Sequence, residues 1–205
     1  MFHFSLQEKG DYKMSTTQPI RNTEKLEIFK DYYRNIKPNK RNYALIITGL
    51  NTALRISDLL DLRYSDIYDF KHSKFHSHLC ITEKKTGKRN QIFINRHSKE
   101  ALESLLNFEE KGENSWIFES QRQKEKPLSR IQAYRIVREA ADYAGLDRCI
   151  SCHSLRKTFG YHAWKLGSQP VVLMNIYNHS TFQITKRYLG IEQDDRDEVF
   201  MNIDI

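Results

Sequence analysis

The chain has no long apolar run and no recognisable leader, and both absences restrict where it works. No apolar stretch among its 205 residues approaches the roughly 20 residues that a helix needs to cross a bilayer. The N-terminus has no apolar segment ahead of a small-residue cleavage site, which a secretory signal requires. Internal repeats and low-complexity tracts are missing as well. We therefore expect a cytoplasmic protein with no membrane partner.

Cysteine is scarce, and two of the three cysteines fall in a haem-like motif. Cys149, Cys152 and His153 match the C-x-x-C-H pattern of covalent haem attachment. We reject haem, because this attachment needs an exported chain and because His153 has a place in another motif. A zinc site needs about four nitrogen or sulfur ligands, and no second ligand pair stands at a suitable spacing. Free, reduced thiols and no metal are therefore expected.

What the chain has in excess is positive charge. Its net charge is +7 and its pI is near 9.2, which suits a polyanionic partner. The charge is unevenly distributed, since residues 192–205 carry a net charge of −5 and residues 1–191 therefore carry +12. Hydrophobic content of 39% and a length of 205 residues predict one globular domain with a sizeable core. The body, not the tail, is expected to face an anionic partner.

The stretch from Cys152 to Tyr188 contains the groups needed to act on a phosphate. His153 and Arg156 are three residues apart in an apolar, helix-favouring run, so a helix would place both on one face. His179 comes just before Ser180-Thr-Phe-Gln, a capping box that predicts the start of a new helix, so His179 is expected near its positive end. Tyr188 falls in the last turn of this helix.

A β-hairpin with a basic tip is predicted upstream. Residues 79–82 and 91–95 alternate in hydrophobicity and flank a turn that contains Gly87. Residues 116–118 predict a third short strand. Helices are expected at about 23–35, 40–51 and 97–109. A short helix is expected from a cap at Ser57 through residue 62, and a longer one from a cap at Ser129 to about residue 143. Two more are expected, one around His153 that stops at Gly167 and one from Pro170 to 177.

In this order the motifs resemble the signature of the tyrosine recombinase (phage integrase) family. Arg55, within Thr-Ala-Leu-Arg-Ile-Ser-Asp, matches the first arginine box, and Lys85, within Glu-Lys-Lys-Thr-Gly-Lys, matches the lysine hairpin. His153, Arg156, His179 and Tyr188 complete the six matching positions, and the match runs from about residue 36 to 191.

Two positions depart from the family pattern. Asn178 stands where a glycine usually precedes the second histidine, and Ala53 stands where glycine is common before Leu-Arg. Neither departure removes a reacting group.

The resemblance implies a role for each matching residue. Arg55 and Arg156 would hold the non-bridging phosphate oxygens, and His179 would add a hydrogen bond. Tyr188 would attack the phosphorus and form a 3′-phosphotyrosyl link. His153 would either accept the tyrosine proton or orient the phosphate. The hairpin lysine, for which Lys85 is preferred and Lys84 is the second candidate, would protonate the leaving 5′ oxygen. No cofactor, metal or ATP is implied.

The resemblance implies that the partner is double-stranded DNA. It also implies that the protein is a monomer in free solution and a tetramer on paired DNA sites. Basic residues that we expect to position the phosphate backbone are Lys84, Lys88, Arg89, Arg130, Arg135 and Arg138. For the three on the helix after Ser129, an ordinary solvated face is an equal alternative.

The expected fold is α+β and predominantly helical: a tyrosine recombinase catalytic domain at 23–191, with a small antiparallel sheet of about three strands at one edge. Residues 1–22 would form a flexible arm, in which Met14 is a second possible start. The acidic tail, 192–205, contains a small apolar group near its end: Val199, Phe200, Met201 and Ile203. This group would pack either on its own domain or on a neighbouring protomer.

Most members of this family carry a further N-terminal domain, so the chain is either a short recombinase or a fragment, and its DNA affinity should be weak and salt-sensitive. Two alternatives remain open: a DNA-binding accessory or regulatory protein that does not recombine, and a type IB topoisomerase-like nicking enzyme.

Overall fold

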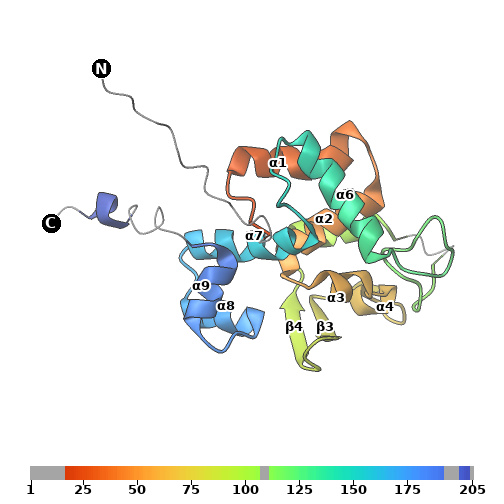
Figure 1. The fold of residues 1–205 in the computed structure, drawn as a ribbon. Helices are drawn as coiled ribbons and strands as arrows, with labels where there is room; N and C mark the ends of the chain where they lie inside the picture. The colour runs from red at the N-terminus through yellow and green to blue at the C-terminus, as the bar shows by residue number, and fades with distance from the viewer. Residues whose placement is uncertain (1–16, 107–110, 192–198, 204–205) are drawn as a thin grey trace, which may run out of the picture.

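Short helices make up most of the structure, a computed structural model that describes residues 17–106, 111–191 and 199–203 (Figure 1). The helices are α1 (Thr23–Asp31), η1 (Tyr32–Ile36, a turn of π-helix), α2 (Lys40–Thr52), α3 (Ile56–Leu60), α4 (Tyr64–Ile67), α5 (Arg96–Glu103), α6 (Arg130–Tyr143), α7 (Cys152–Lys165), α8 (Pro170–Tyr177) and α9 (Phe182–Leu189). No helix in these ranges is long and apolar enough to cross a membrane.

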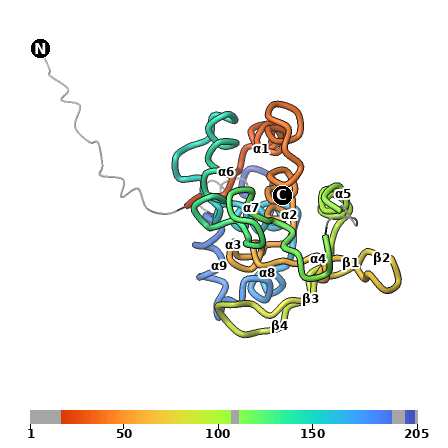
Figure 2. Tube along the Cα trace, turned by 90° about the vertical axis from the view of Figure 1, so that its right-hand side faces the viewer, coloured from red at the N-terminus to blue at the C-terminus, as the bar shows by residue number. Residues whose placement is uncertain are grey.

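The strands form two separate antiparallel pairs. β1 (Tyr68–Asp69) pairs with β2 (Lys74–Phe75), and β3 (His78–Thr82) pairs with β4 (Arg89–Phe93). Figure 2 shows the β3–β4 hairpin running along one side of the molecule with its turn near α8 and α9. The predicted small antiparallel sheet is therefore confirmed at this hairpin, whose turn contains Gly87 with a φ of +67°.

Most helix boundaries follow the capping residues of the sequence. Ser129 and Gln132 form the expected capping box at the start of α6, and Pro170 occupies the first turn of α8. Gly145, Gly167 and Gly190 all have positive φ just after α6, α7 and α9, so the expected stops after these helices are confirmed.

Several local predictions were wrong. The segment 116–118 is not a strand, because it forms only an isolated bridge between Trp116 and Arg63. Ser57 lies inside α3, whose first turn follows an extended Arg55, and the residue that caps α9 is Thr181 rather than Ser180. The first helix divides into α1 and η1. The helix predicted at 97–109 begins at Arg96 and ends at Glu103, and residues 107–110 lie outside the described ranges.

Helix α2 lies at the centre of the main hydrophobic core. Its residues Ala44, Leu45 and Ile46 are fully buried, and it packs against both α5 and α7. A second, smaller cluster joins α8 and α9 to the rest of the domain through Ala53, Leu173, Tyr177, Leu189 and Ile191. This second cluster determines where Tyr188 lies, because the tyrosine packs against it.

Gly160 allows α8 and α9 to approach α7 closely. A Cβ atom at this position would collide with the hydroxyl of Tyr177 and the side chain of Leu189. The helix that carries Tyr188 is therefore in tight contact with the helix that carries His153 and Arg156.

The chain ahead of α1 also belongs to the packed domain from Thr17 onwards. Ile20 is 1% exposed, its backbone N–H donates to Thr158 Oγ1 at 2.9 Å, and its carbonyl oxygen lies 2.9 Å from His162 Nε2. The part of the predicted arm that the structure describes is thus fixed against α7, and residues 1–16 lie outside the described ranges.

Candidate active site

Arg55 lies at the start of α3, directly after the turn that ends α2. Its side chain is 20% exposed, and its Nη1 atom is 2.6 Å from Glu83 Oε2 in the hairpin turn. The guanidinium is thus held at the surface with donor groups left for a ligand.

Arg156 reaches the same region from α7. The residue is 4% exposed, its Nη1 donates to the carbonyl oxygen of Ala53, and its Cζ lies 4.6 Å above the ring centroid of Tyr177. The turn before Arg55 and the helix of Arg156 are therefore joined directly. The two arginines come together as the sequence predicted, since the charges of both act on His153, His179 and Tyr188.

Tyr188 lies between the two histidines. Its ring centroid is 5.2 Å from that of His153 and 5.1 Å from that of His179, both in edge-to-face geometry. Its hydroxyl oxygen is buried, and the guanidinium of Arg156 lies near enough to lower the pKa of the phenol by hydrogen bonding. The hydroxyl and the Arg156 guanidinium therefore face each other inside the site.

The electrostatics of the site favour neutral histidines. Burial, with the positive charges of Lys157, Arg156, Arg55 and Lys85, lowers the pKa of His153 to about 4. Burial and the two arginines also lower the pKa of His179. Burial raises the pKa of Tyr188, and the charge and hydrogen bond of Arg156, with the charge of Arg55, offset part of that rise. At neutral pH both imidazoles are therefore uncharged, and the phenol keeps its proton until a reaction removes it.

His179 is oriented by α9. Its Nδ1 atom lies 3.1 Å from the hydroxyl of Thr185, one turn into the helix, and Thr185 is fully buried. Ser180 and Thr181 separate His179 from the first residue of α9, so the predicted position near the positive end of this helix is confirmed.

The lysines of the hairpin turn differ in their contacts. Lys84 forms an ion pair with Asp61 at 2.8 Å, and its backbone N–H donates to Asp58. Lys88 Nζ is 3.4 Å from Asn178 Oδ1. Lys85 is exposed, has no ion pair among the described residues, and is near enough to His153 to affect its pKa. Among the described hairpin lysines, Lys85 is the one whose charge acts on His153, and the preference for Lys85 over Lys84 stays a prediction.

The other basic residues that we singled out fall into two groups. Arg89, Arg130 and Arg135 are exposed. Arg138 is only 12% exposed in its side chain and bonds to the carbonyl oxygens of Asp147 and Ile150 and to the carboxylate of Asp142. The structure therefore gives Arg138 a part in anchoring the loop before α7.

Three residues near the site were given no role by the sequence. Glu83 was noted only as part of the lysine box, yet it bonds to Arg55. Thr185 contacts His179. Lys157 is 6% exposed, donates to the carbonyl oxygen of Thr17 and lies 5.2 Å from the ring centroid of Tyr188. Its position next to Arg156 was the available signal, but a single lysine is usually exposed.

Both departures from the family pattern occupy left-handed backbone. Ala53 has a φ of 52° and Asn178 a φ of 56°, and each ends a helix, α2 and α8 respectively. Glycine adopts this conformation freely, and asparagine does so more readily than most other residues. The preference for glycine at these two positions therefore has a backbone cause. Among the described residues no group of three or more His, Cys, Asp or Glu could hold a metal ion.

Fold and site together define a class: a mostly helical domain in which two arginines and two neutral histidines surround a buried tyrosine. The chain belongs to the phage integrase family, whose model matches residues 22–194.

Individual relatives agree with this assignment. The probable integrase/recombinase YoeC of Bacillus subtilis is 44% identical over 181 residues, which cover 88% of this chain and 93% of that protein. The type 1 fimbriae regulatory protein FimE of Escherichia coli K12 is 31% identical over 152 residues, covering 72% of this chain and 73% of FimE. The XerH site-specific recombinase bound to its difH substrate has the same fold, with a TM-score of 0.69 at 20% identity over 94% of this chain and 56% of XerH.

Proposed function

We propose that this protein is a site-specific DNA recombinase that cleaves and rejoins DNA strands through a 3′-phosphotyrosyl intermediate. The observation that carries the proposal is the buried hydroxyl of Tyr188, beside the Arg156 guanidinium, with the tyrosine ring between His153 and His179 and within the field of two arginines. The membership of the phage integrase family supports it.

In the cleavage step, the Oη atom of Tyr188 attacks the phosphorus of the scissile phosphodiester, and the bond from phosphorus to the 5′ oxygen breaks. Arg55 and Arg156 stabilise the charge that develops on the non-bridging oxygens. The phenol proton passes to His153, or to water if His153 only orients the phosphate, because burial and neighbouring cations lower the pKa of His153 to about 4 and make it a weak base. Lys85 gives a proton to the leaving 5′ oxygen.

In the rejoining step, the 5′-hydroxyl of a second strand attacks the phosphotyrosine, and the bond from phosphorus to Tyr188 breaks. Tyr188 takes back a proton from the group that accepted it, and the proton of the attacking 5′-hydroxyl passes to Lys85, which gave one up in the cleavage step. The number of phosphodiester bonds is the same before and after the two steps, so the exchange needs no nucleotide hydrolysis.

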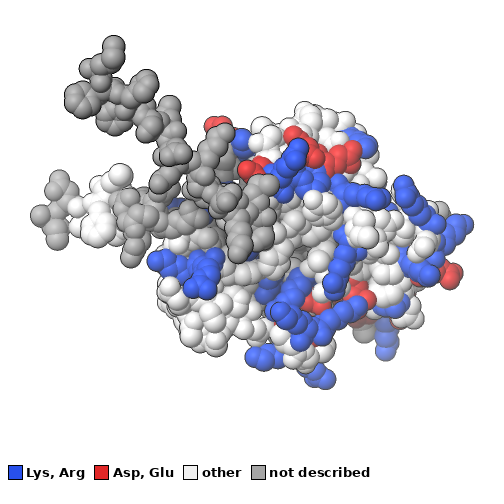
Figure 3. Space-filling model, in the orientation of Figure 1, with Lys and Arg blue, Asp and Glu red and all other residues white. Residues whose placement is uncertain are grey.

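The proposed partner is double-stranded DNA. On the face that Figure 3 draws, Lys and Arg side chains are more widespread than Asp and Glu. We propose that Lys84, Lys88, Arg89, Arg130 and Arg135 contact the phosphate backbone, which positions the protein without reading sequence. Of the proteins that resemble this chain, FimE is named as a type 1 fimbriae regulatory protein. XerH is named as a site-specific recombinase, and its structure contains its difH substrate.

We also propose that the catalytic domain spans residues 23–191, and that the protein is a monomer in solution and a tetramer on paired sites. In the described part of the tail, Phe200 and Met201 are 78% and 82% exposed, which supports a contact with another surface. The rest of the proposed tail, 192–198 and 204–205, lies outside the described ranges.

The proposal is tested by trapping the covalent intermediate. The target site is first recovered by selecting bound duplexes from a random pool, and a nicked suicide duplex of that site is then incubated with wild type and with Tyr188→Phe. We expect a DNA-linked protein band on a denaturing gel with the wild type alone. Binding without a band in either protein would leave the chain as a DNA-binding accessory protein. A band together with relaxation of a supercoiled plasmid that lacks paired sites would indicate a topoisomerase-like enzyme.

A further inference from the structure

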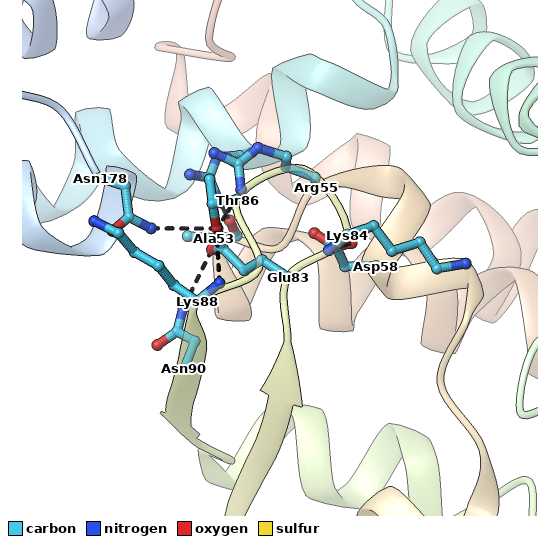
Figure 4. Close-up of polar contacts among 10 residues, drawn as sticks. Ala53, Arg55, Asp58, Glu83, Lys84, Thr86, Lys88, Asn90 and Asn178 are labelled. Carbon is cyan, nitrogen blue, oxygen red and sulfur yellow. Dashed lines mark hydrogen bonds and ion pairs between the residues drawn. The ribbon is translucent and has the colours of Figure 1, made fainter.

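The carboxylate of Glu83 is almost completely buried and accepts hydrogen bonds from several segments. Its side chain is 1% exposed. Oε2 accepts from Arg55 Nη1 at 2.6 Å, from Thr86 Oγ1 at 2.7 Å and from Asn178 Nδ2 at 3.2 Å, and Oε1 lies 3.5 Å from Asn90 Nδ2. Figure 4 shows these side chains converging on Glu83 from different elements.

The donors come from the segments that carry the reacting groups. Arg55 is itself one of those groups, Thr86 follows Lys85 in the hairpin turn, and Asn178 precedes His179 at the end of α8. The backbone of Glu83 also closes the turn, since its N–H donates to the carbonyl oxygen of Lys88 at 2.9 Å. One side chain therefore joins three parts of the site that are far apart in sequence.

The negative charge of Glu83 is unusual next to a site for phosphate. Burial alone would raise the pKa of this carboxyl, but hydrogen bonds from Thr86 and Arg55 and the charges of Arg55 and Arg156 outweigh burial and lower it. The group is thus ionised at neutral pH, and its charge opposes the binding of a second anion at Arg55. A neutral acceptor at this position would favour the binding of DNA. A role for the carboxylate in positioning its donors must therefore show in the reaction rate rather than in affinity.

We propose that Glu83 is a positioning residue: it holds Arg55, the Lys85 turn and the His179 turn in the arrangement that the phosphoryl transfer needs. The inference rests on the proposed function. It predicts that loss of the charge slows the chemical step while leaving DNA affinity equal or higher, because misplaced catalytic groups lower the rate and a repulsive charge is removed.

The variant that tests this is Glu83→Gln. Glutamine keeps the size of the side chain but has one acceptor oxygen, and its amide NH₂ must face one of the donors that now bond to Glu83. Glu139→Gln is the matched control, because Glu139 also accepts from three side chains, Tyr32, Tyr33 and Lys37, none of which belongs to the site.

On the suicide duplex at saturating concentration, we expect Glu83→Gln to form the covalent adduct about 10- to 100-fold more slowly than wild type, with an equal or lower Kd for the duplex. Glu139→Gln should change the melting temperature without changing the adduct rate. An unchanged adduct rate in Glu83→Gln overturns the proposal. Parallel losses of rate, affinity and stability would show that Glu83 only supports folding.

A second readout needs no activity. In the DNA-free protein, backbone hydrogen exchange should become faster in Glu83→Gln at both the Thr86–Lys88 turn and the Asn178–His179 turn. Asn178→Gly removes only the donor from the second turn, and glycine suits the left-handed backbone there. This variant should therefore change exchange at the second turn more than at the first. If the wild type forms no adduct, the proposed function fails, and exchange alone decides whether Glu83 couples the turns. Exchange that stays unchanged at Asn178 and His179 overturns the coupling.

Discussion

The guanidinium of Arg156 donates a hydrogen bond to the carbonyl oxygen of Ala53, which lies 103 positions earlier in the chain. This bond connects the turn that carries Arg55 with the helix that carries His153. Because Arg156 is 4% exposed, its position is set by the protein interior rather than by solvent. Each guanidinium is thus held by the protein itself, Arg156 by Ala53 and Arg55 by Glu83. For the proposed reaction this is the condition for electrostatic preorganisation.

Replacing Ala53 by glycine should stabilise the protein. Ala53 has a φ of 52°, a conformation that strains a side chain with a Cβ atom, and glycine relieves this strain. The gain is offset in part by chain entropy and by the lost packing of the Ala53 methyl group, which is buried in the second cluster. We expect the free energy of unfolding to rise by less than about 1 kcal/mol, measured by chemical denaturation. Ala44→Gly, in the interior of α2, is the control and should be destabilising. A loss of stability in both variants would contradict the prediction.

His153 should remain neutral in the folded protein well below pH 6. Its pKa is lowered to about 4 by burial and by four neighbouring cations, whereas an unperturbed histidine titrates near 6.5. Between these two values the unfolded chain binds more protons, so the contribution of His153 to stability is present above pH 6.5 and is lost as the pH falls towards 4. NMR titration of the ring protons checks this.

The ring protons of His153 should show no titration between pH 8 and 5.5 in the native state, and the same residue in denaturant is the reference. Titration near 6.5 in the native protein would contradict the prediction, and His153→Asn identifies the signal.

Thr185→Val should slow the reaction without unfolding the protein. The change removes the hydroxyl that lies 3.1 Å from His179 Nδ1, so the imidazole loses the contact that orients it. We expect adduct formation to slow by about 10- to 100-fold, and Thr185→Ser to retain most of the rate. Thr48→Val is the matched control, because the Thr48 hydroxyl is buried without a partner among the described residues. Equal rates in Thr185→Val and wild type would show that the contact has no part in the chemistry.

Arg135 and Arg138 share one helix but should respond differently to truncation. Arg135 is exposed, so Arg135→Ala should weaken binding to all duplexes and reduce the slope of log Kobs against log salt by about 1. Arg138→Ala should instead lower the free energy of unfolding by about 1–2 kcal/mol, because the side chain anchors the carbonyl oxygens of Asp147 and Ile150. Fluorescence anisotropy at several salt concentrations and denaturant titration distinguish the two effects. The reverse pattern would contradict the assignment of either residue.

Local signals in the sequence predicted much of the fold and the arrangement of the site. The capping box at Ser129, the stop at Gly190 and the helical spacing of His153 and Arg156 each depend on a few neighbouring residues, and each is confirmed. Where two adjacent residues could cap, as at Ser180 and Thr181, the choice depends on backbone angles that the sequence does not specify.

Other features depend on residues that are distant in sequence. Glu83 meets Arg55 and Asn178 only after the hairpin has packed against both α3 and α8. Lys157 is buried because the segment from Thr17 covers it. The segment around Trp116 has the pattern of a strand but only one bridge partner, Arg63, so it does not extend into a sheet. No pattern within one segment indicates contacts of this kind.

The absence of a side chain at Gly160 has a consequence for anyone who wishes to alter this protein. Even one methyl group there would meet Tyr177 and Leu189, so a larger residue at this position should be destabilising. The outer face of α6 is different, since Ile131 and Tyr134 are 65% and 47% exposed and support little packing. A library that diversifies the exposed positions Ile131 and Tyr134 would therefore retain more folded members than one that diversifies the residues packed around Gly160.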